Sequence, residues 1–427
     1  MALEVSGQRK SLVASLLIAL FGIILYSYRI GYPESMYFDE VYHVATGREF
    51  LNLSPFTENV HPPLGKLFIS LSIAIFGNHS WSWRLPSLFC GILSLVVLFH
   101  IVFQLTKNYF TSLLSVFFFL LDGLSMTQAR IAMLNAPMLF FMLLSLWGAL
   151  LFEAEQSPKW RFLCLSGISL GLAVATRFVA LGIIMPIAMV LGRWVWRNLF
   201  TKKLTTPRAS FVFMLLLFYG LVPFLIYFAA HIIIPVIFHR NLLSAQGFFQ
   251  AVRDIWDYQI NMFHYHVTLK ESHRYGSSWL DWPLMSRPIW FHYKEIQGQA
   301  RGILCLGNPA IFWMMPLAIG YSLFNCLKRK DFAHVIAVIG FLSQWLPWAL
   351  ISRVKFFHYF YACMPFVALS LSLLVQRLLR EGPVMKGIVI GYLVFVIVSF
   401  AYWYPLYVGY PMSIPALEHH LWFNRWI

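Results

Sequence analysis

The sequence predicts an all-α polytopic membrane protein with about eleven transmembrane helices, and three observations lead to this prediction. Hydrophobic residues make up 59% of the 427 residues, whereas Asp, Glu, Lys and Arg make up only 11%. Soluble domains carry about 25% charged residues, and the mean hydropathy of +0.69 is also too high for one. Apolar segments of about 20 residues, the length that crosses a bilayer, recur along the chain. We therefore expect a single integral-membrane domain over residues 1–427.

Eleven segments are apolar enough to be candidate spans: 12–29, 84–105, 109–126, 134–152, 161–176, 178–193, 209–230, 308–327, 332–351, 356–379 and 385–404. The fifth and sixth are short and are joined by Thr176-Arg177, so they could form one broken hairpin. The run from Leu67 to Phe76 is too short to span, and we expect an interfacial helix there. Two long external loops remain, residues 30–83 and 231–307, and both are rich in Trp, Tyr and His.

The distribution of Lys and Arg predicts a cytoplasmic N-terminus. Half of the 32 basic residues fall into short segments on one side, such as Arg9-Lys10, Arg193 to Arg208, and Arg377 to Lys386. The other half lie mostly in the two long loops, which the positive-inside rule does not count. Both long loops are therefore expected on the outer face.

Composition argues against two other classes of protein. The net charge of +15 does not indicate nucleic-acid binding, because the basic residues are scattered between apolar runs and form no long basic face. Cytoplasmic loops and anionic headgroups explain the charge better. Four of the five cysteines lie inside apolar runs and none forms a CxxC pair, so neither a disulfide framework nor a zinc site is predicted.

The stretch from Tyr37 to Lys66 is the main candidate for a functional site. Asp39 and Glu40 directly follow the first apolar segment, and charged groups at a membrane boundary are costly and usually functional. Such a carboxylate can deprotonate a hydroxyl or hold a metal or positive group; two solvated acids at a helix end are the plain alternative. The motif HPPLGK at residues 61–66 follows, where the prolines fix an extended entry and Lys66 supplies a cation.

Basic residues also occur in short or membrane-edge positions of the outer face, where the positive-inside rule predicts few of them. These are Arg84, Arg130, Arg177, Arg353 and Lys355. A ring of cations at this depth suits a lipid phosphate, because the planar fork of arginine can bind two of its oxygens. Snorkelling to ordinary headgroups is the alternative for each residue alone.

Four histidines in or near the outer loops raise the question of a divalent metal ion: His61, His264, His266 and His358. The two rings of His264-x-His266 share a face only in a strand, and no acidic third ligand stands at a familiar spacing. Histidines of this kind are more often interfacial hydrogen-bonding groups. The metal requirement is therefore left open.

Several motifs resemble those of the protein O-mannosyltransferase family, which are C-type membrane glycosyltransferases that use a polyprenyl-phosphate sugar. FDEVYH resembles the Asp-Glu motif of the first external loop, and HPPLGKL the signature that follows it. WRLPS, MTQARIAMLNAPMLFF, LGNPAIFW, RVKFFHYFYACMPF and the ending WYPLYVGYPMS…LWFNRWI are similar to later motifs and occur in the family order. The resemblance covers residues 37 to 427.

The resemblance implies an inverting transfer of a sugar, typically mannose, from a polyprenyl-phosphate donor to a Ser or Thr hydroxyl of a secreted or membrane protein. Asp39 would be the catalytic base or would orient the acceptor, and Glu40 would assist placement of acceptor or donor. Arg84, Arg130 and Arg353 would hold the donor phosphate, with Lys355 as a further candidate. The same motifs make His61, Lys66 and His358 candidates for substrate binding.

Two departures from the family pattern matter. Asn135 stands where many members have an acidic residue, which puts a second carboxylate role in doubt. The large lumenal domain of eukaryotic members is absent, because residues 231–307 are too few to hold it. This indicates a bacterial-type enzyme of the plasma (inner) membrane and weakens the inference that the acceptor is a protein. A lipid or glycan acceptor, as in aminoarabinose transferases, stays open, as do a lipid-linked sugar transporter, a non-catalytic subunit and an oligomer.

Overall fold

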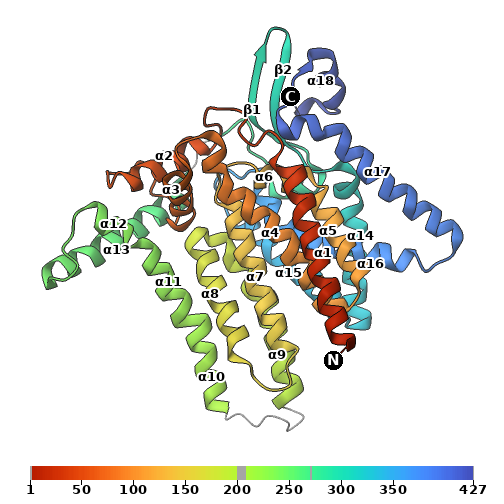
Figure 1. Ribbon diagram of the computed structural model, residues 1–427, viewed down its shortest axis with the longest axis horizontal. Helices are drawn as coiled ribbons and strands as arrows, with labels where there is room; N and C mark the ends of the chain where they lie inside the picture. Colours follow the sequence, from red (N-terminus) through yellow and green to blue (C-terminus); the bar gives the residue numbers. More distant parts are fainter. Residues whose placement is uncertain (1, 200–207, 270–271, 427) are drawn as a thin grey trace.

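The computed structural model describes residues 2–199, 208–269 and 272–426, and it shows a multi-pass helical membrane protein (Figure 1). Among these residues, nine helical segments are long and apolar enough to span a bilayer. They are Arg9–Ser27 of α1 (Ala2–Ser27), α4 (Ser80–Thr106), α7 (Asn135–Glu153), Phe178–Asn198, Ala209–Ile237, α14 (Pro309–Arg329), Phe332–Leu350, Phe357–Leu378 and α17 (Pro383–Val408).

Several spans are composite helices. The 3₁₀-helix η1 (Phe178–Ile183) runs into α9 (Ile184–Leu199), η4 (Leu346–Leu350) follows α15 (Phe332–Trp345), and η5 (Phe357–Cys363) precedes α16 (Met364–Leu378). The long span Ala209–Ile237 consists of α10 (Arg208–Leu216), the π-helix η2 (Leu217–Leu221), α11 (Val222–His231) and α12 (Ile233–Ile237). Residues 200–207, part of the predicted basic segment from Arg193 to Arg208, lie outside the described residues.

All eleven predicted segments coincide with helices, but two of them differ from an ordinary span. The third is a pair of helices, α5 (Tyr109–Leu120) and α6 (Gly123–Ala129), that meet at 71°. Asp122 explains the break, because its carboxylate accepts the Ser125 N–H at 2.8 Å and so caps a new helix. The fifth, α8 (Trp160–Thr176), has only 17 residues. The helical fold class is confirmed, whereas the count of eleven stays a prediction.

The first predicted external loop, residues 30–83, contains two helices. They are α2 (Glu40–Leu51), which follows Asp39 without a side-chain capping hydrogen bond, and α3 (Leu64–Phe76), which includes the expected interfacial segment. Gly65 allows α3 to approach its neighbours closely, since a Cβ there would lie 2.6 Å from Leu134 Cδ2 and 3.2 Å from Thr176 Cγ2. The HPPLGK motif therefore serves packing as well as any chemistry.

The second predicted loop, residues 231–307, is more regular than its sequence suggests. It holds α13 (Ala245–Thr268), η3 (Trp279–Leu284) and a hairpin of β1 (Ile289–Ile296) and β2 (Gln299–Cys305). Gln297 and Gly298 both have positive φ, as a two-residue type I′ turn requires. The short strand β3 (Met412–Ser413) pairs with β2. The small helices α18 (Ile414–His420) and η6 (Asn424–Trp426) end the described chain.

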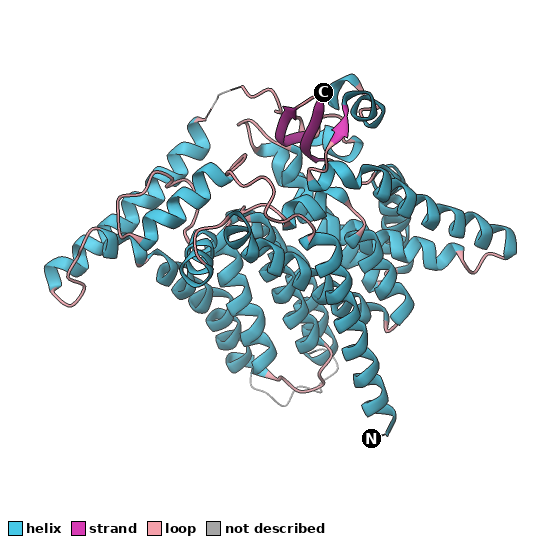
Figure 2. Ribbon diagram, turned by 45° about the horizontal axis from the view of Figure 1, so that its top comes forward, coloured by secondary structure: helices cyan, strands magenta, loops and turns pink. Residues whose placement is uncertain are grey.

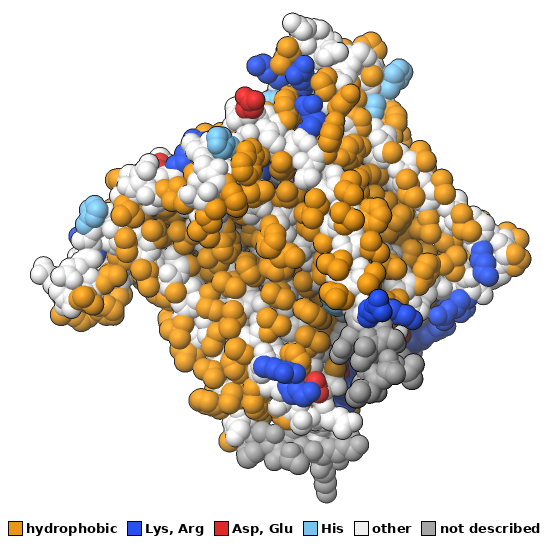
Figure 3. Space-filling model, viewed as in Figure 1, with side chains coloured by type: hydrophobic (Ala, Val, Ile, Leu, Met, Phe, Trp, Pro, Cys, Tyr) orange, Lys and Arg blue, Asp and Glu red, His pale blue; other side chains and the backbone are white. Residues whose placement is uncertain are grey.

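Figures 1 and 2 show how these elements are arranged. The hairpin and α18 stand at one end of the molecule, whereas the N-terminus lies at the opposite end. In the centre, α7 packs against α4 and α8, and α16 packs against α5 and α14. Hydrophobic side chains cover most of the face between the two ends, as expected for contact with lipid (Figure 3). The elements of the two loops that were predicted to be external therefore gather at the end that carries the hairpin.

Candidate active site

Asp39 and Glu40 are adjacent in sequence, but their carboxylates have different surroundings. Glu40 is fully buried: Arg84 Nε donates to its Oε1 at 2.8 Å and Arg84 Nη2 donates to its Oε2 at 2.9 Å. The Ala132 N–H donates to Oε1 at 2.9 Å as well. Asp39 is partly exposed, and its carboxylate forms no hydrogen bond or ion pair with another described residue. Only Asp39 is therefore free to act on a substrate.

The electrostatic surroundings of Asp39 suit a proton acceptor. Burial raises the pKa of Asp39 above its ordinary value, although the charges of His43 and Arg177 act in the opposite direction. A carboxylate with a raised pKa is a better base than an exposed one. The position of Arg177 also means that a bound anion near this guanidinium would lie close to Asp39.

A cavity of ≈ 620 Å³ opens beside this region. Most of its wall is apolar and comes from η1, α13 and η4, including Phe178, Leu181, Phe263, Pro347, Trp348 and Ile351. Polar groups line it as well, namely Arg177, Arg353, His61, His266, Gln259, Ser343 and Gln344. A mostly apolar pocket with a few polar groups is the usual form of a ligand site. The two arginines make this one suitable for an amphipathic anion.

Arg177 and Arg353 converge on the same aromatic ring. The guanidinium carbons lie 5.0 and 5.7 Å from the ring centroid of Tyr359, within cation–π range. Arg177 Nη1 also donates to Asn135 Oδ1, and Asn135 Nδ2 donates to Gln128 Oε1 at 2.6 Å. Because Asn135 is neutral, it orients Arg177 without cancelling its charge. Two positive charges are thus held at one end of the cavity.

The other predicted cations are placed differently. Arg84 is fully buried against Glu40 and also donates to the Ile30 carbonyl at 2.9 Å. Arg130 is buried too, and its Nη1 donates to the Tyr26 carbonyl. Lys355 Nζ donates to the Ile351 carbonyl at 2.5 Å, and Lys355 lines a second cavity rather than the first. Of the predicted ring of cations, Arg177 and Arg353 line the apolar cavity; of those that the resemblance assigned to the phosphate, only Arg353 does so.

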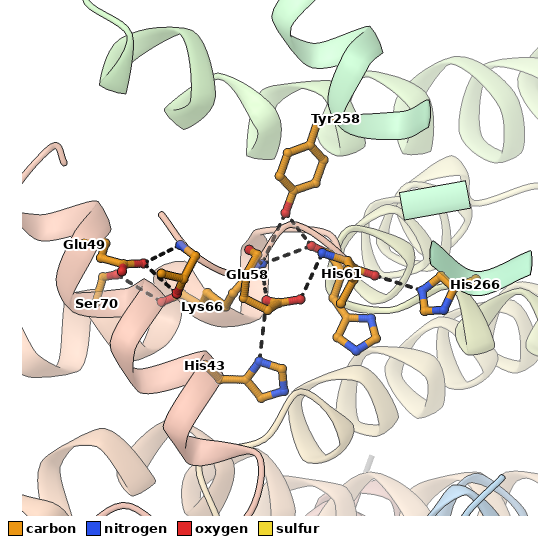
Figure 4. A network of polar contacts seen from close by, with 10 residues as sticks. His43, Glu49, Glu58, His61, Lys66, Ser70, Tyr258 and His266 are labelled. Atoms are coloured by element: carbon orange, nitrogen blue, oxygen red, sulfur yellow. Dashed lines mark hydrogen bonds and ion pairs between the residues drawn. The ribbon is translucent and has the colours of Figure 1, made fainter. Parts of the chain in front are cut away.

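Lys66 is held inside a buried polar network (Figure 4). Its Nζ donates to Glu58 Oε2 at 2.6 Å, to the Glu58 and His61 carbonyls at 3.1 Å, and to Tyr258 OH at 3.2 Å. Burial raises the pKa of Glu58, but the Lys66 ammonium and His43 outweigh it, so this pKa lies well below the usual value. The predicted interfacial cation is therefore engaged within the protein, where it ties the 58–66 segment to α13.

The histidines stack rather than converge. His61 lies parallel to His266 with ring centroids 5.4 Å apart, and 5.8 Å from the ring of His43. His266 Nε2 donates a hydrogen bond to the Val60 carbonyl at 2.8 Å. His264 and His266 lie in helix α13, not in the strand that would align their rings. Within the described ranges, no group of three or more His, Cys, Asp or Glu is arranged to hold a metal ion.

Burial lowers the pKa of His61 well below its usual value and lowers that of His266 to about 4. Both rings are therefore neutral at pH 7 and present hydrogen-bonding groups to the cavity, not charge. His358 lies among aromatic rings, 5.7 Å from Phe38 and 4.5 Å from Tyr359 between centroids. Neither of its ring nitrogens has a hydrogen-bond partner among the described residues.

Sequence analysis missed some residues of the site and left one without a role. Arg177 was predicted as one of the outer cations that suit a lipid phosphate, but the family resemblance assigned it no role. The missed residues Gln259 and Phe263 line the cavity from α13, together with His266, which was considered only as a metal ligand or an interfacial hydrogen-bonding group. Reading 245–268 as an amphipathic helix would have placed all three on one face. Glu58 carried no such signal, since it is a single acid in an irregular stretch.

Fold comparison shows that the chain has the C-type glycosyltransferase fold. The Saccharomyces cerevisiae protein O-mannosyltransferase Pmt1–Pmt2 complex bound to the sugar donor superposes with a TM-score of 0.83, at 14% identity, over 98% of this chain and 93% of that chain. ArnT from Cupriavidus metallidurans bound to undecaprenyl phosphate gives a TM-score of 0.59, at 14% identity, over 97% of this chain and 75% of that chain.

Sequence comparison is more specific. A family model described as dolichyl-phosphate-mannose-protein mannosyltransferase matches residues 16–81 and 76–238, and one described as the C-terminal four TMM region of protein-O-mannosyltransferase matches 251–426. The chain therefore belongs to the protein O-mannosyltransferase family.

Bacterial relatives match most of the chain. The polyprenol-phosphate-mannose–protein mannosyltransferase of Mycobacterium tuberculosis is 25% identical over 91% of this chain and 86% of its own length. That of Corynebacterium glutamicum is 24% identical, over 86% and 81%.

Proposed function

We propose that this protein transfers mannose from a polyprenyl-phosphate-mannose donor to a Ser or Thr hydroxyl of a protein, with inversion at the anomeric carbon. One observation carries the proposal: an apolar cavity with two converging arginines lies beside a carboxylate that forms no hydrogen bond or ion pair with any other described residue. Family membership and the names of the bacterial relatives support mannose as the sugar and protein as the acceptor.

The cavity fits the two chemical parts of such a donor. The apolar wall from η1, α13 and η4 would hold the first isoprene units of the lipid. Arg177 and Arg353 would bind the phosphate, since guanidinium groups form paired hydrogen bonds with phosphate oxygens. Asn135 contributes by keeping Arg177 oriented and fully charged.

The reaction then needs one proton transfer and one displacement. The acceptor hydroxyl oxygen attacks C1 of mannose from the face opposite the phosphate, and its proton passes to Asp39. The bond between C1 and the phosphate oxygen breaks, and polyprenyl phosphate leaves with the electron pair. Arg177 and Arg353 stabilise the negative charge that develops on the leaving phosphate.

In this proposal, three buried charged residues position the site without contacting the substrate: Glu40, Arg84 and Lys66. The Glu40–Arg84 pair joins the start of α2 to α4 and to the Ala132 backbone, and so fixes the direction of Asp39. Lys66 holds the 58–66 segment, which places His61 in the cavity wall. Removing one partner of such a buried pair typically costs about 3–5 kcal/mol.

We place the active site on the outer face of the plasma membrane, with the N-terminus in the cytoplasm. The bias of Lys and Arg in short loops supports this orientation. The donor would enter sideways from the outer leaflet, because the cavity wall is apolar.

The test uses the purified protein in lipid nanodiscs, radiolabelled polyprenyl-phosphate mannose and a Thr-containing peptide. Asp39→Asn is expected to lower transfer by about 10²–10⁴-fold, the usual contribution of a general base, while donor binding persists. Asp257→Asn, an exposed acid on α13, is the control and should keep wild-type turnover. Parallel reactions with EDTA and with added Mn²⁺ establish the metal requirement.

Full turnover by a folded Asp39→Asn protein would remove Asp39 from the mechanism. Label that moves into a glycolipid and never into peptide would show a lipid acceptor instead. Bound donor without transfer to any acceptor would indicate a transporter or a non-catalytic subunit.

A further inference from the structure

A second cavity, of ≈ 690 Å³, lies beside the first on the side of the external loops. It is formed by the segment from Ser272 to Arg287, the turn from Ser352 to Lys355, and Arg425 near the end of the described chain. Arg353 lines both cavities. The outer cavity therefore begins where the donor phosphate is proposed to lie.

The described lining of the outer cavity carries an excess of positive charge. Arg287, Arg353, Lys355 and Arg425 face a single carboxylate, Asp281. That carboxylate already accepts the Ser278 N–H at 3.2 Å as part of a helix cap. Arg287, Arg353 and Arg425 form no ion pair or hydrogen bond with another described residue. Such a cavity attracts anions.

The wall of the outer cavity is hydrophilic, unlike that of the donor cavity. Five serines line it, namely Ser272, Ser277, Ser278, Ser286 and Ser352. Trp279 and Val354 are its large or branched apolar residues. It offers hydroxyl groups and cations but little surface for an acyl chain, so a hydrophilic anionic chain fits it better than a lipid.

A chain of aromatic contacts leads from this cavity back to the catalytic carboxylate. The ring of His273, in the cavity wall, lies 5.1 Å from Phe356 between centroids, and Phe356 stacks on His358 at 5.7 Å. His358 contacts Phe38 at 5.7 Å, and Phe38 immediately precedes Asp39.

We propose that the outer cavity binds acidic side chains of the protein acceptor, on one side of the reacting Ser or Thr, and so makes the enzyme prefer acceptor sites in acidic segments. This inference rests on the proposed function and adds a substrate preference to it. Arg287 and Arg425 are the specificity residues, whereas Arg353 is shared with the donor site.

The experiment compares two Thr-containing peptides that differ only in flanking Glu or Gln residues. The proteins are wild type, Arg287→Gln/Arg425→Gln, and the charge-matched control Arg253→Gln/Lys294→Gln, whose residues lie outside both cavities. Donor and nanodisc lipid are kept constant, and kcat/KM and peptide affinity are both measured.

Wild type should favour the Glu peptide by about tenfold in kcat/KM, because an exposed or rim charge pair contributes roughly threefold and two such pairs add. The double variant should lose this preference through a higher KM, with unchanged kcat/KM for the Gln peptide. The control variant should keep the preference. Added salt should reduce it in wild type.

Equal use of both peptides by wild type would overturn the inference while leaving the proposed transferase intact. A preference that persists in the Arg287→Gln/Arg425→Gln protein would overturn it too. Replacing phosphatidylcholine with phosphatidylglycerol tests the other anion: a variant defect that follows lipid charge and not peptide charge would assign the cavity to headgroups instead. If no peptide accepts mannose and both peptides bind with equal affinity, the proposed function and this inference are both wrong.

Discussion

At the scale of single residues, two neighbouring carboxylates have separate tasks. The Asp39-Glu40 pair could be recognised from its position after an apolar segment, but sequence alone does not divide the two carboxylates into one that is paired and one that is free. That division depends on Arg84 and Ala132, which come from distant parts of the chain and take up the carboxylate of Glu40. Adjacent residues in a helical start point in different directions, so only one of the two is left free.

Lys66 shows the same limit. Hydropathy places a cation at the edge of the membrane, where a bound phosphate is a reasonable expectation. Its actual partner, Glu58, sits in an irregular stretch whose path cannot be derived from periodicity. A lysine that is fully buried needs a counter-charge to offset the cost of leaving water, and the sequence does not say which acid supplies it.

The raised pKa of Asp39 leads to a prediction about pH. A general base must be deprotonated, so kcat/KM should fall tenfold per pH unit below the pKa of Asp39. Because burial raises this pKa, the fall should begin at a higher pH than for an exposed aspartate. The donor is a phosphodiester and stays ionised, so it does not contribute. The measurement is a pH profile of mannose transfer.

Two cavity histidines also gain protons in acid, and donor binding must be measured alongside. Protonated His61 or His266 would add positive charge near the phosphate, so donor affinity should rise as pH falls, opposite in sign to the rate. A rate that stays constant through the weakly acidic range would contradict the role of Asp39 as the general base. The same pH dependence in the residual activity of Asp39→Asn would contradict it too.

At the scale of elements, hydropathy located the membrane helices but not the outer structure. The β1–β2 hairpin carries an alternating pattern and a Gln297-Gly298 turn, both of which are readable in sequence. Helix α13 is amphipathic rather than apolar, so a search for bilayer-crossing segments passes over it. The packing of these elements could not be predicted, because it depends on contacts between distant parts of the chain. Tyr258 OH on α13, for example, donates to the His61 carbonyl at 2.7 Å.

One close contact between elements shapes the donor cavity. A Cβ on Gly182, in η1, would lie 2.7 Å from the Ser343 carbonyl and 2.5 Å from Gln344 Nε2 on α15. Backbone cannot move aside cheaply, so Gly182→Ala should push η1 away from α15 and disturb a wall that both elements line. We expect a roughly tenfold loss of donor affinity, which is about 1.4 kcal/mol and lies within the ~1–3 kcal/mol that overpacking typically costs.

The span itself supplies the matched control. Gly192 lies in the same helical segment, and a Cβ there would meet nothing within 4 Å. Gly192→Ala should therefore leave donor affinity and thermal stability at wild-type values or slightly improve stability. Equal affinities for the two variants, measured by titrating donor into nanodiscs, would show that the η1–α15 contact does not shape the site.

At the scale of the whole molecule, the charged groups that line the cavities and the hydrophobic surface that contacts lipid come from different parts of the chain. The charged side chains and histidines that line the two cavities lie outside the spans, whereas the spans cover the sides with hydrophobic surface (Figure 3). The charge bias in short loops predicts which end faces the cytoplasm. Neither hydropathy nor packing predicts it, because both are the same for the two possible orientations of a helix bundle in the membrane. Orientation is therefore the property of this molecule that most needs a direct test.

Two variants, each with one introduced cysteine, test the orientation of the protein in the membrane. Lys294 is exposed on the hairpin and Gln156 is exposed between α7 and α8, at the opposite end (Figure 1). In intact cells, a membrane-impermeant maleimide should label Lys294→Cys but not Gln156→Cys, which should react only after permeabilisation. The native cysteines are buried or half-buried, so wild-type protein sets the background. The reverse pattern would put the hairpin, both cavities and Asp39 in the cytoplasm, where an acceptor would have to be modified before export.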